Sequence, residues 1–482
     1  MSTDAPSRRA ASPTRRARSR KRRGRAFAFA FAGVVGLLAT LGIAGAAVST
    51  AQGPRVTDVQ VDPAAAVAAS GSRLIVTTSQ ALREIDADQV TVTPATPFAV
   101  DTSGRSLGVR FTLPLHDDTE YTVTIEGVGG LGGGPATTIT QKFRTGDAEF
   151  FLLQRGDDED RIFRTDLSGE KAVPVFRLAH IEDFRATTSH LVVSVRGEPD
   201  GDDPGAFGPA ELIVTDLDGL NERSLPLPGT GSVTNLQSSD RADLVGFTFT
   251  DDTIGTTGGR ESMLFTISLK EPDAEPVAVE VTGADNRVVQ WRFVPGTDRV
   301  LFVGFDGTLW LADTTGGAAT PFGTAMNLDD VSGSTAVIER PEGLVALDLE
   351  TGLEQPLAGT ETEQGLLRTV LTVPGGGTLR LLATIDDEGL PVGSAVSYVQ
   401  NDGSSSTIAE FPLTDAVIRT CVSPNGRYAA MIVGPDMISN PYDTYLLPVP
   451  QRVQTHIVEI STGDEVVTLA GFDSSWCRVP PQ

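Results

Sequence analysis

A short turn that carries aspartate and glycine recurs through the last two thirds of the chain and constrains its fold more than any other feature. Between Leu212 and Leu227 the sequence reads LIVTDLDGLNERSLPL, an apolar run, a turn from Asp216 to Gly219 and a second run. Apolar alternation interrupted by a glycine-containing turn is typical of a β-hairpin. The same kind of turn recurs at Asp166–Gly169, Asp313–Gly316, Asp348–Gly352, Asn401–Gly403 and Ser461–Gly463. Such repetition indicates a protein built from repeated β units.

Each hairpin belongs to a longer unit to which four strands can be assigned, named here from A, the innermost, to D, the outermost. Units of about 35–55 residues with four strands are typical of β-propeller blades. The segment from Val422 to Ile432, VSPNGRYAAMI, resembles the A-to-B step of TolB-like and WD-repeat-like propellers. We therefore expect a seven-bladed propeller over residues 149–478. Its B strands are predicted at Glu149–Leu153, His190–Val195, Leu244–Thr250, Arg299–Gly304, Thr335–Glu339, Thr378–Ala383 and Arg427–Val433.

The strand order leaves one A strand missing, because the first unit begins at strand B. We expect the C-terminal segment Gly471–Pro480 to complete the first blade and close the ring, because its part Trp476–Pro480 aligns with the A-strand segments Trp291–Pro295 and Thr420–Pro424. Cys421 and Cys477 then occupy equivalent positions on neighbouring inner strands, which predicts a disulfide. The alternative is a pair of buried free thiols, since Cα atoms more than about 7 Å apart cannot be bridged.

Residues 54–146 predict a separate β-sandwich. The stretch Leu113–Val123, LPLHDDTEYTV, resembles the tyrosine-corner region of immunoglobulin-like domains, and the whole segment resembles the bacterial Ig-like domains of surface-layer and envelope proteins. That resemblance implies a spacer or adhesion module. Strands are expected at Arg55–Val61, Ser72–Thr78, Gln89–Thr93, Ser106–Thr112, Glu120–Ile125 and Thr137–Phe143. The predicted fold class is thus all-β, an Ig-like sandwich plus a seven-bladed propeller, preceded by one transmembrane helix.

The transmembrane helix is predicted from the uncharged segment Ala26–Val48. At ~1.5 Å per residue this segment would extend about 34 Å, enough to cross a hydrocarbon core. Basic residues precede it but do not follow it, so residues 1–25 are expected in the cytoplasm and the bulk of this single-pass protein outside the cell membrane. The alternative is a cleaved signal peptide, because Ala44-Gly45-Ala46 has the small-x-small pattern of a cleavage site.

Charge separates the N-terminal tail from the rest of the chain. Met1 to Arg25 contains ten basic residues and one acidic residue, whereas the whole chain carries a net charge of −25. Nucleic-acid binding needs a basic surface that neutralises phosphates, so an acidic body excludes nucleic acid as a partner.

The B–C loops of the predicted propeller hold most of the insertions, and insertions on one face usually mark a binding face. Clustered carboxylates attract Ca²⁺ or a cationic partner, which makes Asp200, Asp202 and Asp203 weak candidates for a metal site. The alternative is a solvated acidic face. Its carboxylates are Asp157, Asp158, Asp160, Asp200, Asp202, Asp203, Asp251, Asp252, Asp386, Asp387 and Asp436.

The longest of these loops, Pro435–Gln451, is rich in apolar and tyrosine side chains, which are favoured at binding surfaces. The alternative is a loop that folds back over its blade. The candidate partner-binding residues are Met437, Asn440, Tyr442, Tyr445 and Leu446, and Ile438 and Leu447 are also expected to be exposed.

No motif in the sequence specifies a catalytic centre. Gly104–Gly108 matches a serine-hydrolase elbow by letters but lies before a β-strand, and the four histidines are far apart. The sequence predicts a non-enzymatic, membrane-anchored extracytoplasmic binding or scaffold protein that engages an envelope protein or polymer through its B–C loops. No cofactor is expected, although calcium is possible. The alternative is a carboxylate-dependent hydrolase or lyase of cell-envelope glycan or peptide.

Overall fold

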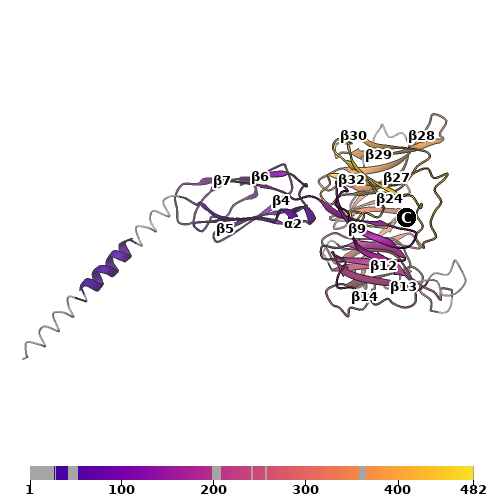
Figure 1. Cartoon of the computed structure of the whole chain (residues 1–482), viewed down its shortest axis with the longest axis horizontal. Helices are drawn as coiled ribbons and strands as arrows, with labels where there is room; N and C mark the ends of the chain where they lie inside the picture. The colour runs from indigo at the N-terminus through magenta and orange to yellow at the C-terminus, as the bar shows by residue number, and fades with distance from the viewer. Residues whose placement is uncertain are drawn as a thin grey trace, which may run out of the picture.

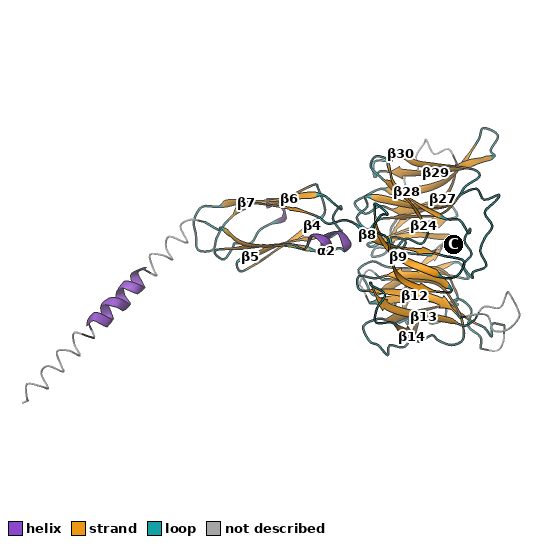
Figure 2. Cartoon of the chain, in the orientation of Figure 1, coloured by secondary structure: helices purple, strands orange, loops and turns teal. Residues whose placement is uncertain are grey.

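The computed structural model describes residues 27, 29–41, 53–197, 208–239, 243–255, 258–357 and 365–480. The described part is all-β apart from short helices, and it forms a two-sheet N-terminal domain followed by a larger domain of seven sheets (Figures 1 and 2).

The N-terminal domain packs two antiparallel sheets over one apolar core. Alternating strands such as β6 place Tyr121, Val123 and Ile125 inside, as the period of two requires. The short helix α2 (Pro63–Ala68) is capped by Asp62, whose carboxylate accepts the N–H groups of Ala64 and Ala65. The sheets are β1 (Val56–Gln60), β2 (Arg73–Thr78), β5 (Ser106–Phe111) and β4 (Phe98–Ser103), and β3 (Val90–Thr93), β6 (Glu120–Val128) and β7 (Thr137–Arg144).

Strand β4 and helix α2 were not expected. The other strands lie within one to three residues of the predicted bounds. The Tyr121 hydroxyl accepts the backbone N–H of His116 at 3.0 Å.

The C-terminal domain consists of antiparallel sheets numbered here 1 to 7 in chain order. Sheet 1 is β8 (Glu149–Gln154), β9 (Asp160–Asp166) and β10 (Val173–Leu178); sheet 2 is β11 (Ile181–Ala186), β12 (His190–Arg196), β13 (Ala210–Asp216) and β14 (Arg223–Leu225); sheet 3 is β15 (Gly231–Ser238), β16 (Leu244–Asp251), β17 (Met263–Ser268) and β18 (Val277–Ala278). Sheet 4 is β19 (Val288–Phe293), β20 (Arg299–Gly304), β21 (Thr308–Asp313) and β22 (Ala319–Thr324); sheet 5 is β23 (Asn327–Ser332), β24 (Thr335–Arg340), β25 (Gly343–Asp348) and β26 (Glu354–Pro356). Sheet 6 is β27 (Leu366–Thr372), β28 (Thr378–Ile385), β29 (Pro391–Val399) and β30 (Ser405–Pro412); sheet 7 is β31 (Ala416–Val422), β32 (Tyr428–Gly434), β33 (Gln454–Glu459) and β34 (Glu465–Ala470).

The Asp/Gly turns owe their shape to backbone capture by the aspartate side chain. Asp216 accepts the N–H groups of Asp218 and Leu220, and Gly219 takes a left-handed φ of +76°. A Cβ atom at Gly219 would lie 1.7 Å from the carbonyl oxygen of Val175 in β10, so the turn also packs closely against the preceding sheet. Glycine is required there by both the dihedral angle and the space.

Each innermost strand contacts the innermost strand of the next sheet, from β8 to β31, so the sheets follow one another around an axis. The innermost strands β11, β15, β19, β23, β27 and β31 each carry a bulge or irregularity where they pair with the second strand.

The C-terminal segment lies between the last sheet and the first. Phe472 and Leu153 exchange backbone hydrogen bonds at 2.8 and 2.9 Å, and the N–H of Ser475 donates to the carbonyl of Phe151. Trp476 packs on Phe150 with 4.7 Å between ring centroids. Within the predicted closing segment Gly471–Pro480, the first residues run along β8 through a bridge between Phe472 and Leu153. The part Trp476–Pro480 contains no strand, because the chain turns at Ser475.

Cys421 and Cys477 form a disulfide with a Cα–Cα distance of 5.1 Å. The bond joins β31 to the C-terminal segment.

The two domains meet at the turn before β32. The Asn425 side chain donates to the carbonyl of Leu115, while Arg427 and the Tyr428 hydroxyl contact the carboxylate of Asp117 at 3.3 and 3.0 Å. The sandwich therefore lies against the end of the sheets where first and second strands are joined (Figure 1). The opposite end, formed by the loops between second and third strands, is called the B–C end below.

Residues 27 and 29–41 are α-helical and expose apolar side chains such as Phe29 and Leu38. In the described part of the chain no helix combines the length and the apolar character that a membrane span requires. Most of the remaining residues of the predicted span Ala26–Val48 lie outside the described residues, as does the tail at 1–25.

Candidate functional site

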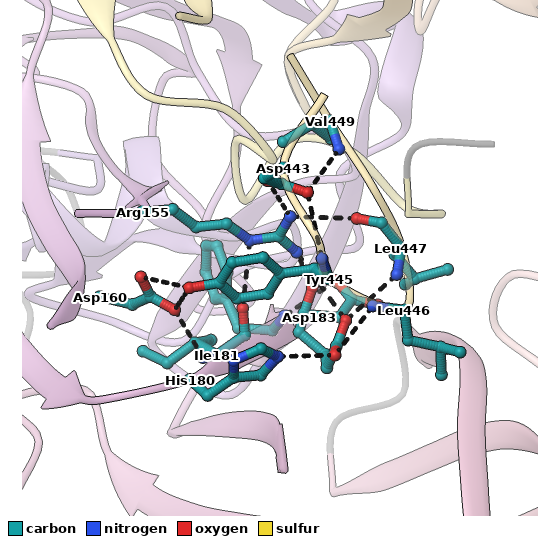
Figure 3. Close-up of polar contacts among 12 residues, drawn as sticks. Arg155, Asp160, His180, Ile181, Asp183, Asp443, Tyr445, Leu446, Leu447 and Val449 are labelled. Atoms are coloured by element: carbon teal, nitrogen blue, oxygen red, sulfur yellow. Dashed lines mark hydrogen bonds and ion pairs between the residues drawn. The ribbon is translucent and has the colours of Figure 1, made fainter. Parts of the chain in front are cut away.

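The loop between β32 and β33, residues 435–453, folds back over sheets 1 and 2 (Figure 3). Asn440 is buried and fixes its base, because its amide donates to the carbonyls of Pro435 and Arg452 and accepts the N–H of Arg452. The loop conformation is therefore set by internal contacts.

Arg155 is the centre of the contacts between this loop and the first two sheets. Its guanidinium pairs with Asp443 at 2.7 Å and donates to the carbonyls of Leu447 and Glu182, both at 3.0 Å. It also lies 3.7 Å from the ring centroid of Tyr445, a cation–π contact. Because the side chains of Arg155 and Asp443 are almost fully buried, this pair is screened little by solvent.

The Tyr445 hydroxyl donates to the carboxylate of Asp160 at 2.8 Å. Asp160 is fully buried and also accepts the N–H of Ile181 at 2.7 Å. Burial raises the pKa of Asp160, although the hydrogen bonds from Ile181 and Tyr445 oppose that rise. Burial and the Asp160 carboxylate together raise the pKa of Tyr445.

Glu182 binds the backbone of the 435–453 loop at Leu446 and Leu447. Its carboxylate accepts the N–H groups of Leu446 and Leu447 at 3.1 and 3.2 Å and lies 3.0 Å from Nε2 of His180. Although burial acts in the opposite direction, these hydrogen bonds lower the pKa of Glu182. The His180 ring stacks on Tyr445 at 3.9 Å.

The structure divides the predicted partner-binding residues. Tyr442 is 54% exposed and Ile438 is 89% exposed. Met437 is half-buried, and Asn440, Tyr445 and Leu446 are engaged within the protein, so the expectation of an exposed Tyr445, Leu446 and Leu447 is wrong. The physical reason is the set of buried acceptors, Asp160 and Glu182, that this loop satisfies.

The acidic B–C face is also less open than expected. Asp160 belongs to the loop contacts, and Asp251 forms a two-pronged pair with Arg260, each N–O distance being 2.8 Å. Asp200, Asp202 and Asp203 lie outside the described residues. Within the described residues no group of three or more metal-ligating side chains is assembled, and calcium binding stays a prediction.

Exposed apolar side chains gather at the B–C end of sheets 6 and 7. Strand pairing aligns Gly393 with Pro412, which places Val392 beside Leu413 at one edge. The N–H of Met437 donates to the carbonyl of Thr414, which brings the 435–453 loop to the same edge. The exposed side chains of this edge, named here the apolar edge, are Leu366, Leu390, Val392, Leu413 and Ile438.

A pocket of about 40 Å³ lies on the axis among the innermost strands. Three arginines line it, Arg292, Arg419 and Arg478, together with Asp329 and Asp330. Burial raises the pKa of Asp329 to about 6, against the hydrogen bond from Val370 and the charge of Arg292. Burial and the charges of Arg292 and Arg185 lower the pKa of Arg419 to about 9.

A second buried charge cluster is closed to solvent. Arg185 pairs with Asp183 at 2.9 Å and with Asp473 at 2.8 Å, and all three side chains are at most 3% exposed. Burial raises the pKa of Asp183 well above its usual range. This cluster ties the C-terminal segment to β11 rather than presenting carboxylates to a ligand.

Sequence reasoning missed the axis pocket and the role of Arg155. The alternation of the innermost strands gives no hint of their bulges, which shift the inward-facing residue by one position. Arg155 lies in a short acidic loop whose sequence gives no sign that its guanidinium holds the 435–453 loop.

No family model and no curated protein matches the sequence. Solved β-propeller-like structures resemble the chain at low identity. A dihydro-heme d1 dehydrogenase, NirN, in complex with DHE is 15% identical over 68% of this chain and 74% of its own, with a TM-score of 0.38. A putative 6-phosphogluconolactonase from Bacteroides fragilis is 13% identical over 68% and 97%, with a TM-score of 0.39. The β-propeller domain of Myceliophteria thermophila Cps50 (Swd1) is 14% identical over 61% and 87%, also at 0.39.

These structures correct the expectation that the chain is not an enzyme. Two of the three are named as enzymes. TM-scores below 0.5 carry no activity over to this chain.

Proposed function

We propose that the protein is a membrane-anchored, extracytoplasmic binding protein in which an Ig-like stalk presents a seven-bladed propeller to a protein partner. The apolar segment Ala26–Val48 would serve as the anchor. The disulfide Cys421–Cys477 supports a location outside the cytoplasm, because disulfides persist in oxidising compartments.

The observation that carries the proposal is the apolar edge. Single exposed apolar side chains are ordinary, whereas a group of them at one edge marks an interaction site. The sandwich contacts Asn425 and Arg427 at the opposite end, so the apolar edge faces away from the stalk and is free to meet a partner.

The charges around the apolar edge define the chemistry of the partner. Its rim is acidic and half-buried or exposed, which favours a protein surface with an apolar centre and basic surroundings. The rim residues are Asp386, Asp387, Glu388, Asp415 and Asp436.

Substitution at the apolar edge tests this function. Leu413→Asp and Ile438→Asp place a charge in the centre of the edge and should abolish capture of the partner while leaving the melting temperature unchanged. Leu220→Asp and Leu353→Asp are matched controls, because both leucines are exposed in turns at the other end of the sheets. Equal loss of capture in all four variants would remove the apolar edge as the binding site.

The anchor has its own test. Membrane extraction at alkaline pH should leave the intact chain in the membrane fraction, and added protease should reach residues 53–480 from outside the cell. Release of a soluble chain shortened near Ala46 would support a cleaved signal peptide in place of an anchor.

A carboxylate-dependent hydrolase or lyase of envelope glycan or peptide is a second candidate. The observation that favours it is Asp329, a pocket carboxyl whose pKa is raised to about 6 by burial, as general acids require. Turnover of glycan or peptide substrates that disappears in Asp329→Asn would establish the enzymatic function. Identical turnover in that variant would show that Asp329 is not the general acid.

A further inference from the structure

The axis pocket contains three arginines that form no salt bridge with any carboxylate among the described residues. Arg292 donates only to the carbonyls of Trp291 and Asp329, Arg419 to the carbonyl of Pro480, and Arg478 to the carbonyl of Val331. In the described part of the chain, none of the three guanidinium groups forms an ion pair with a carboxylate.

The two aspartates of the pocket are occupied by backbone groups instead. Asp329 accepts the N–H of Val370 at 3.1 Å, and Asp330 accepts the N–H of Thr372 at 2.9 Å. Because burial raises the pKa of Asp329 to about 6, it neutralises less of the arginine charge under mildly acidic conditions. Three guanidinium groups against two carboxylates leave the pocket with an excess of positive charge, inside a protein of net charge −25.

Unsatisfied donors are present at the same place. Arg292 Nε and Thr420 Oγ1 are buried and lack a hydrogen-bond partner within the described residues. A buried donor without a partner is unfavourable, more so when it is charged, and a bound acceptor would satisfy it. Like charges also repel here: after burial, the charges of Arg292 and Arg185 lower the pKa of Arg419. Burial also lowers the pKa of Arg292, where the charges of Asp330 and Asp329 act against it and the charge of Arg478 adds to it.

The size of the pocket limits the ligand. A volume of about 40 Å³ has room for about three water molecules at ~10–15 Å³ each, which matches the three heavy atoms of a carboxylate group. Guanidinium groups bind carboxylates through paired N–H donors. Arg478 is exposed, so a ligand can reach the pocket from solvent.

We propose that the axis pocket binds the carboxylate group of a ligand through Arg292, Arg419 and Arg478. Thr372 and Val422 end β27 and β31 near this pocket, which places it toward the end of the sheets that faces the sandwich. The site is separate from the apolar edge and does not depend on the binding function proposed there.

Two sources of a carboxylate are distinguishable by titration calorimetry on the full chain. Acetate and succinate represent small acids, and a short peptide with a free C-terminus, compared with its amidated form, represents a chain end; chloride is the control anion. Saturable binding of either carboxylate source supports the proposal, and the source that binds more tightly names the ligand class. Absence of saturable binding of both at millimolar concentration, or tighter binding of phosphate than of any carboxylate, would overturn it.

Arginine substitutions separate binding from folding. Arg478→Gln and Arg419→Gln should each raise the Kd about tenfold or more, since a charged hydrogen bond is lost. Arg419→Lys should weaken binding less, because lysine keeps the positive charge and loses only the paired N–H donors of the guanidinium. Arg105→Gln in the sandwich is the control for an exposed arginine.

The melting temperature without ligand distinguishes a ligand site from a structural cluster. Removing Arg478 relieves repulsion with Arg292, so Arg478→Gln should melt at or above the temperature of the original protein. A lower melting temperature together with unchanged carboxylate affinity would show that Arg478 serves structure alone and would contradict the proposal.

Discussion

The hydroxyl of Tyr445 offers a direct test of how the 435–453 loop is held. Tyr445→Phe removes only the hydrogen bond to Asp160 and leaves the ring on Arg155 and His180. A hydrogen bond to a charged group contributes about 1.5–3 kcal/mol, so the variant should unfold at a temperature a few degrees lower at neutral pH. Tyr442→Phe is the matched control, because Tyr442 is 54% exposed and should show no change.

The pH dependence of that difference follows from Asp160. The Tyr445 hydroxyl stabilises the charged carboxylate of Asp160, so removing that hydroxyl raises the pKa of Asp160 further. Below that pKa the carboxyl is neutral and the lost bond is worth about 1 kcal/mol. The melting-temperature gap should therefore shrink as the pH falls through the raised pKa of Asp160, and limited proteolysis at neutral pH should cut the loop faster in the variant.

Equal melting temperatures for Tyr445→Phe and the original protein at neutral pH would refute this reasoning. So would a gap that stays constant as the pH is lowered, since that would mean that the hydroxyl does not act through the Asp160 carboxylate.

Three further outcomes follow from the structure. Reducing the disulfide, or replacing Cys421 and Cys477 by serine, should cost about 4 kcal/mol of unfolding free energy for a 56-residue separation, measured by urea unfolding. Asp329 has a folded pKa of about 6 against 3.8 unfolded, so its contribution of about 3 kcal/mol is present below pH 4 and is lost as the pH rises to 6. Asp329→Asn should flatten that slope. Asp117→Asn should weaken the contact with Arg427 and widen the distribution of interdomain distances in solution scattering.

The repeated strands were predictable because their signals are local. Each of the predicted B strands, from Glu149–Leu153 to Arg427–Val433, corresponds to a strand from β8 to β32, and the turn glycines Gly169, Gly219 and Gly463 all have positive φ. Apolar alternation and a glycine-containing turn depend only on neighbouring residues.

The site was less predictable because its contacts join residues far apart in the chain. Arg155 and Asp443 are 288 positions apart, and nothing in either segment indicates that they pair. The loop's tyrosines look alike in sequence, yet Tyr445 meets a buried carboxylate and Tyr442 faces solvent. Exposure depends on which buried acceptors a loop must satisfy, and sequence periodicity contains no such information.

Photo-crosslinking in intact cells is the most direct test of the proposed binding face. A crosslinking amino acid at Ile438 or Leu413 should give an adduct of the same single mass, and the same residue at Leu220 or Leu353 should give none. Equal adducts from both ends of the sheets, or adducts from Leu353 alone, would contradict a partner that binds at the apolar edge.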